Sequence, residues 1–217
     1  MTDAKRALGA TEKLDWLRLL RSENVGPVTS YKLLKRFGTA TAALDAVPEL
    51  ANKSGARSIK VASRAAAEKE LQEINQRNAH LIARTEPAYP PLLSCLEDAP
   101  PLIIVMGHAH FLKKKTVSII GTRNASITGV RLAHSFAASF GEAGFLVASG
   151  LARGIDTVAH QGALATGTVA IVAGGADIIY PRENDELCAR IVDQGAELSE
   201  IPLGTAPQAR NFPRRNR

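Results

Sequence analysis

Three glycine-containing turns carry the residue types best suited to binding a phosphate group. The first is Gly121-Thr122-Arg123, where glycine permits a sharp turn and arginine supplies a planar fork of N–H donors. Ser126 and Gly129 follow where a helix N-terminus is expected, and helix N-termini favour anions. The motif is neither G-x-G-x-x-G nor a P-loop, so it lacks the second glycine that a dinucleotide requires. Arg123 either binds phosphate or ties the loop to a carboxylate.

The second turn contains Ser149, Gly150, Arg153 and Gly154, ahead of a stretch with helical character. Two glycines that flank an arginine allow successive backbone N–H groups to point at one anion. We therefore expect this turn to contact the same ligand as the first.

Asp156 and His160 come next and lie four residues apart on one helix face. Such a pair is able to perform acid–base catalysis, yet no Ser or Cys nucleophile is evidently paired with it. Asp156 also stands where an N-cap or first-turn acid belongs. We favour a structural role near the site for both residues.

The third turn, Gly174-Gly175, follows another apolar run, and we expect it to shape the site rather than to bind. The last segment is different, because it surrounds an aromatic residue with cations. Stacking combined with phosphate pairing is what single-stranded nucleic acids require. The candidate binding residues of this segment are Arg210, Asn211, Phe212, Arg214, Arg215, Asn216 and Arg217.

Three apolar runs must position these turns: 117–120, 146–148 and 169–173. Each is followed at once by one of the turns, and helical spacing separates the runs. Val130, Ala133, Ala137 and Phe140, for example, fall on one helix face. Such alternation predicts an α/β fold with a Rossmann-like parallel sheet, whose ligands bind at the carboxyl ends of the strands.

The N-terminal part reads as helices only. A Gly26-Pro27 turn precedes a short helix that ends at Gly38, which resembles a helix-hairpin-helix of the SAM-like kind. This module is either purely structural or a contact for DNA, and the second interpretation is supported by the cations Lys32, Lys35 and Arg36. We expect a helical domain over 1–78 and a Rossmann-like domain over 79–217.

The net charge of +6 is compatible with a nucleic-acid partner. Lys113–Lys115 form either a solvated lead-in to a strand or a binding patch. No secretory signal and no apolar run long enough for a membrane is evident. Cys95 and Cys188 have no metal-ligand spacing, so we expect two reduced thiols, no metal and a cytoplasmic location.

Five segments together resemble the DNA-processing protein A family, also called DprA or Smf. They are IIGTRNASITG, ASGLARGIDTVAHQGAL, AGGADIIYPREN, LSEIPLGTAP and NFPRRNR, within residues 80–217. The helical module fits as well, because many members carry a SAM-like domain there. The resemblance implies an extended Rossmann-like fold that binds single-stranded DNA at the first turn, the second turn and 212–217.

The resemblance further implies protection of incoming DNA during natural transformation and loading of the RecA recombinase. It implies homodimers, no enzymatic activity and no cofactor. Family members continue past the F-P-x-R-N-R motif, so the second domain is expected to be truncated at its C-terminal end.

Two enzyme classes share this style of glycine-rich turn. One is a nucleotide-processing hydrolase of the lysine-decarboxylase-like group, whose P-G-G-x-G-T-x-x-E pattern is not matched by AGGADIIYP. The other is a NAD-dependent oxidoreductase, which the missing G-x-G-x-x-G disfavours. The hydrolase remains the alternative to single-stranded DNA binding.

Overall fold

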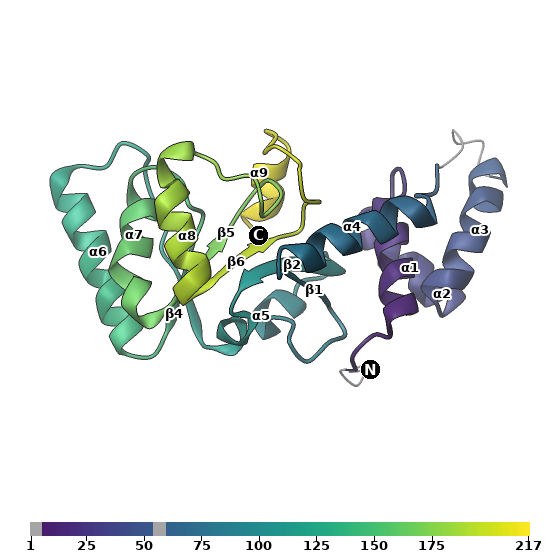
Figure 1. Cartoon of the computed structure of the whole chain (residues 1–217), viewed down its shortest axis with the longest axis horizontal. Coiled ribbons are helices and arrows are strands. Elements are labelled where there is room, and N and C mark those ends of the chain that lie inside the picture. The colour runs from purple at the N-terminus through teal and green to yellow at the C-terminus, as the bar shows by residue number, and fades with distance from the viewer. Residues whose placement is uncertain (1–5, 54–59) are drawn as a thin grey trace. The chain divides into compact units, whose positions relative to one another are not determined.

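The structure is a computed structural model that describes residues 6–53 and 60–217 (Figure 1). It divides into two compact units, Met1–Glu73 with Leu81–Leu102 and Ile74–His80 with Ile103–Arg217. Within the described ranges, we find no helix with the length and apolar character needed to cross a membrane. The predicted domain boundary after residue 78 stays a prediction.

The first unit is built on helices, as the spacing of its apolar residues predicts. Its helices are α1 (Ala10–Arg21), α2 (Pro27–Phe37), α3 (Ala40–Lys53) and most of α4 (Arg64–Gln76). Gly38 ends α2 with a φ of 80°, a conformation that glycine adopts without penalty, and its N–H donates to Leu34 O at 2.8 Å. Apolar side chains from α1 and α3, Leu19 and Leu44 among them, form the core of this unit.

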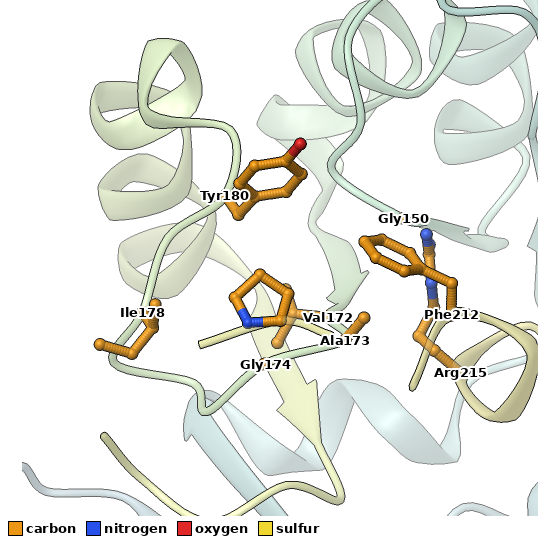
Figure 2. Close-up of a pocket in the computed structure, with 9 residues that line it drawn as sticks. Gly150, Val172, Ala173, Gly174, Ile178, Tyr180, Phe212 and Arg215 are labelled. Carbon is orange, nitrogen blue, oxygen red and sulfur yellow. The ribbon is translucent and has the colours of Figure 1, made fainter. Parts of the chain in front are cut away.

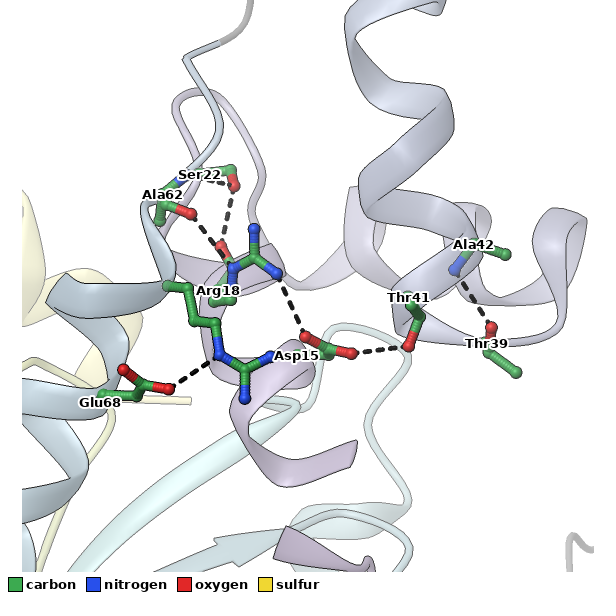
Figure 3. Close-up of polar contacts among 9 residues, drawn as sticks. Asp15, Arg18, Ser22, Thr39, Thr41, Ala42, Ala62 and Glu68 are labelled. Atoms are coloured by element: carbon green, nitrogen blue, oxygen red, sulfur yellow. Dashed lines mark hydrogen bonds and ion pairs between the residues drawn. The ribbon is translucent and has the colours of Figure 1, made fainter. Parts of the chain in front are cut away.

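A buried carboxylate joins α1 to α3 (Figure 3). Asp15 is 4% exposed, accepts from the Thr41 hydroxyl at 2.6 Å and pairs with Arg18 at 3.3 Å. Ser22 donates to Arg18 O at 2.8 Å and accepts from the Ala62 N–H at 3.1 Å. These polar contacts satisfy groups that would otherwise be costly to bury.

The strands form a six-stranded sheet in the order β1-β2-β6-β5-β4-β3. They are β1 (His80–Ala83), β2 (Leu102–Gly107), β3 (Thr116–Ser118), β4 (Leu146–Ser149), β5 (Thr168–Ile171) and β6 (Ala196–Ser199). β3, β4, β5 and β6 pair in parallel, as expected, but β2 runs antiparallel to β6. The sheet is therefore mixed and mostly parallel, and the α/β, Rossmann-like prediction is confirmed.

Helices α6 (Ile127–Glu142), α7 (Ile155–Ala163) and α8 (Asp185–Gln194) lie side by side along the sheet (Figure 1). Close approach of α7 to α6 requires Gly162, because a Cβ there would overlap the His134 carbonyl. Ala133 and Ala137 face inward as predicted, whereas Phe140 is 37% exposed.

The remaining helical pieces are short. They are α5 (Pro91–Ser94), the 3₁₀ turns η1 (Ala109–Lys113), η2 (Leu164–Thr166) and η3 (Arg182–Asn184), and α9 (Asn211–Arg215). α9 belongs to the predicted binding segment, and η1 lies between β2 and β3.

Candidate nucleic-acid interface

The first two turns interlock where β3 and β4 end. A Cβ on Gly121 would stand 2.5 Å from Ile155 Cγ1, at the start of α7. A Cβ on Gly154, whose φ is 78°, would stand 2.7 Å from Arg123 O. The Ile155 N–H donates to Thr122 O at 3.2 Å. Both glycines are therefore needed for the turns to touch, and this contact builds one edge, which we call the rim.

The first turn leaves its arginine available. Thr122 Oγ1 accepts from the Asn124 N–H at 3.2 Å, which fixes the loop. Arg123 is exposed, and its side chain makes no hydrogen bond or ion pair with any residue in the described ranges. Ser126 caps α6 by accepting from the Gly129 N–H at 3.1 Å. The cap occupies the Ser126 hydroxyl, so among these predicted residues Arg123 is the one whose side chain is free for phosphate.

The second turn is held from inside by a carboxylate. Asp156 is 5% exposed, and its Oδ2 accepts from the Gly150 N–H at 3.1 Å and the Ala152 N–H at 3.4 Å. Ser149 is also buried, and its hydroxyl donates to Ile119 O at 2.6 Å. The Gly150 and Ala152 amides point at Asp156, so these two N–H groups of the turn are already engaged within the protein.

His160 forms its side-chain hydrogen bond with Thr168 and not with Asp156. The Thr168 hydroxyl donates to Val147 O at 2.7 Å, so its oxygen accepts from His160 Nδ1 at 2.9 Å. The ring is fully buried, and burial lowers the pKa of His160 to about 3. A neutral, enclosed imidazole supports packing beneath the sheet and does not face the rim.

The segment 210–217, which we call the tail, returns to the rim through α9. Asn211 is 6% exposed and donates from Nδ2 to Ala173 O at 3.0 Å, which anchors the tail at the end of β5. Arg215 then reaches the Gly150 backbone. Burial lowers the pKa of Arg215, Asp156 opposes this effect, and the positive charge of Arg123 adds to it. Arg123 and Arg215 are therefore close enough to repel each other, and a bound anion would offset this repulsion.

Aromatic rings line a small hollow beside Arg215 (Figure 2). Phe212 meets Tyr180 edge to face at 6.5 Å between ring centroids, and the Arg215 guanidinium lies 5.9 Å from the Phe212 ring. Val172 and Gly174 form part of its floor. A half-buried ring next to a cation is suited to stacking a base while a phosphate is held.

Carboxylates hold several of the other arginines. Glu200 lies 2.9 Å from Arg217 and 3.8 Å from Arg214. Glu183 pairs with Arg153, and both of these side chains are more than half exposed. Arg210 and Asn216 are exposed at the surface of the tail.

The third turn gives the chain room to fold back. A Cβ on Gly174 would stand 3.0 Å from Thr205 O, and one on Gly175 would stand 2.5 Å from Pro202 O. The Gly175 N–H donates to Thr205 O at 2.8 Å. These glycines thus serve the packing of 202–207, which leads into the tail.

A family model described as DNA recombination-mediator protein A matches residues 80–217, which include the rim and the tail. The chain belongs to this family. A second family model, the DprA-like N-terminal HHH domain, matches residues 10–72. The suspected resemblance is confirmed.

Relatives and solved structures agree with this assignment. The chain is 39% identical over 153 residues to Protein Smf of Escherichia coli, covering 69% of this chain and 41% of that protein. The X-ray structure of DNA processing protein A from Streptococcus pneumoniae matches with a TM-score of 0.73 at 24% identity, over 97% of this chain and 74% of that one, and shows the shared fold. A Helicobacter pylori DNA processing protein A structure, which concerns single-stranded DNA binding, matches with a TM-score of 0.59 at 27% identity, over 64% of this chain and 62% of that one.

Sequence reasoning missed two residues at the rim. Ile155 fills the space above Gly121, and Glu183 pairs with Arg153, an arginine that the sequence presents as free. The acid-rich stretch after Tyr180 gave a hint for Glu183. No local signal identifies Ile155, because its partner lies 34 positions earlier in the chain.

Proposed function

We propose that this chain binds single-stranded DNA along the rim and the tail, and that it does so without catalysing a reaction. One observation carries the proposal: Arg123 is exposed and unpaired among the described residues, while Arg215 and Phe212 lie at the same rim. Two guanidinium groups and a ring supply phosphate binding and base stacking together. The Helicobacter pylori relative, whose structure concerns single-stranded DNA binding, supports the ligand class.

The biological role that we propose follows the family. The chain would protect incoming single strands during DNA uptake and deliver them to the RecA recombinase, as a homodimer in the cytoplasm. The names of relatives, such as DNA processing protein DprA of Streptococcus pneumoniae, support a role in DNA handling. The chain spans 41% of the Escherichia coli relative, so these roles are proposed for the whole protein to which such a segment contributes.

The absence of catalysis is argued from the acid–base pair. Asp156 is occupied by two loop amides, and His160 is enclosed with Thr168. Neither group presents a proton donor or acceptor at the rim, so the hydrolase alternative has no general base from this pair. A nucleotide turnover assay tests this alternative, and measurable hydrolysis that follows Asp156 or His160 would restore it.

Fluorescence anisotropy with oligothymidylate and with a matched duplex, across a salt series, tests the proposal. We expect a preference for the single strand and an affinity that falls by about 0.7 log units per log unit of salt for each phosphate contacted. Arg123→Ala should weaken binding more than tenfold, whereas Arg190→Ala, an exposed arginine on α8, should not. If the two variants bind with equal affinity, Arg123 does not form the phosphate site.

A further inference from the structure

A second group of cations lies at the opposite end of the strands from the rim. We call residues 108–115 the basic turn; they contain η1 and carry His108, His110 and three consecutive lysines, Lys113, Lys114 and Lys115. Lys115 directly precedes β3, and its carbonyl accepts from the Leu146 N–H at 2.8 Å, at the start of β4. The basic turn therefore lies where the parallel strands begin, whereas the rim lies where they end.

The basic turn is held in place by its own aromatic residue. The Phe111 ring fills the space above Gly167, where a Cβ would stand 2.7 Å from Phe111 Cζ. His110 stacks on this ring at 4.6 Å between centroids, and Lys114 Nζ lies 4.3 Å from its centre. Leu112 is 5% exposed and anchors the turn further. Because the ring and its neighbours fix the backbone, the cations are displayed on a defined surface.

The lysines of the basic turn are free of carboxylates. All three are exposed, and no ion pair joins any of them to an acid within residues 6–53 and 60–217. His108 Nε2 donates to the Asp193 backbone carbonyl at 2.8 Å, and the His108 backbone N–H donates to Gly195 O at 2.8 Å. By contrast, Glu200 occupies two arginines of the tail. Among the described residues, the basic turn thus presents three adjacent unpaired cations, in addition to the unpaired Arg123 at the rim.

We propose that the basic turn is a second contact for single-stranded DNA, which holds phosphates of a strand that extends beyond the rim. The inference rests on the proposed function and adds a site that the rim residues do not include. Adjacent lysines bind phosphates as point charges without reading bases, so the contact should tolerate any sequence. Lys115 and Gly121 are six positions apart and therefore at most about 22 Å apart, so one strand that leaves the rim has a short path to the basic turn.

A strand long enough to reach both contacts binds more tightly than a short one, because the second contact forms within a complex that already exists. The test uses Lys113→Gln/Lys114→Gln/Lys115→Gln in the full chain. The matched control is Lys60→Gln/Arg64→Gln/Lys69→Gln, which removes the same charge from exposed positions in the helical unit. Oligothymidylates of about 8 and about 30 nucleotides serve as probes, since one binding site covers roughly 4–16 nucleotides.

We expect the triple variant to bind the long probe about tenfold more weakly, with its salt slope reduced by about 2 because each lost phosphate contact lowers it by about 0.7. The short probe should change less than twofold relative to the control. The double variant Lys113→Gln/Lys115→Gln, which keeps the contact of Lys114 with Phe111, should show the same selectivity if the triple variant folds poorly.

Three outcomes would overturn the inference. If the triple variant binds the long probe as tightly as the control variant does, the basic turn does not contact the strand. If the triple variant loses the same affinity for both probes, the effect is one of net charge and not of a second contact. If the basic turn binds anionic vesicles or heparin while the long-probe affinity is unchanged, its partner is another polyanion. Failure of the proposed function looks different, because the unaltered chain would then bind neither probe and Arg123→Ala would have no effect.

Discussion

The guanidinium of Arg215 rests directly on the backbone of Gly150, in the space that any side chain at position 150 would need. Gly150 donates its N–H to Asp156, so a buried acid lies close to the same arginine. This relationship links the second turn to the tail, although Gly150 and Arg215 are 65 positions apart in the sequence. The binding surface therefore requires glycine at position 150, because the methyl group of an alanine there would overlap the Arg215 guanidinium.

Gly150→Ala should therefore weaken single-stranded DNA binding. Gly150 is not among the glycines with positive φ, so alanine fits the backbone, but its Cβ must displace Arg215. We expect a loss of about tenfold in affinity, equal to ~1.4 kcal/mol. Gly9→Ala is a suitable control, since its Cβ would meet nothing nearer than 3.8 Å. Unchanged binding by a folded Gly150→Ala protein would show that Arg215 does not contact the strand.

Phe212→Ala should remove one stacked base. Base–aromatic stacking contributes about 1–3 kcal/mol per base, so the affinity for oligothymidylate should fall by roughly fivefold to a hundredfold. Phe212→Tyr keeps the ring and should retain most of the binding. Should the alanine and tyrosine variants bind alike, Phe212 is a packing partner of Tyr180 and not a stacking platform.

Glu183→Gln should strengthen binding. Glu183 holds Arg153 in an exposed ion pair, and the Glu183 backbone amide together with Arg153 lowers the pKa of the carboxyl, so it stays charged and competes with phosphate at neutral pH. Exposed ion pairs are weak, so the expected gain is about twofold to fivefold, most visible at low salt. Glu186→Gln makes the same charge change at an exposed position of α8 and is the control. An equal gain in both variants would assign the effect to net charge alone.

Glu197→Gln should stabilise the fold in a pH-dependent way. Burial raises the pKa of Glu197 to about 7 from an ordinary 4.5, although the Cys188 thiol donates to it at 3.3 Å. The folded state therefore holds a proton that the unfolded state has lost between these pH values, so wild-type stability decreases as the pH rises from 4.5 to 7. We expect a gain on the order of 3 kcal/mol above pH 7 that vanishes near pH 4.

Denaturant unfolding from pH 4 to 8 measures this difference, with Glu142→Gln, an exposed acid on α6, as the control. The buried His160 has the opposite slope, because its lowered pKa costs stability as the pH falls below about 6.5. Subtracting the wild-type curve removes that contribution. A Glu197→Gln effect that is the same at every pH would contradict the shifted titration.

Local patterns were sufficient for the strands and for the position of the rim. The runs before Gly121, Gly150 and Gly174 are strands, and parallel pairing brings their ends together. Helix capping at Ser126 and the first-turn position of Asp156 are also local. These features follow from neighbours in the sequence, where spacing and propensity are informative.

Contacts across the chain were not accessible from the sequence. The pairing of Arg217 with Glu200, the enclosure of His160 by Thr168 and the antiparallel setting of β2 each depend on how distant segments pack. A count of arginines in the tail therefore overstates the charge that is available to a ligand. The sequence predicts which side chains stand near the rim, and only tertiary packing decides which are already engaged.

The interlock of the first two turns ties the evolution of two segments together. Any side chain at Gly121 must occupy the volume of Ile155, and one at Gly154 must displace the backbone at Arg123. A replacement that is harmful at Gly121 becomes tolerable only when position 155 is reduced in size, so these two sites should be strongly epistatic. The rim should then change by paired substitutions rather than by single ones.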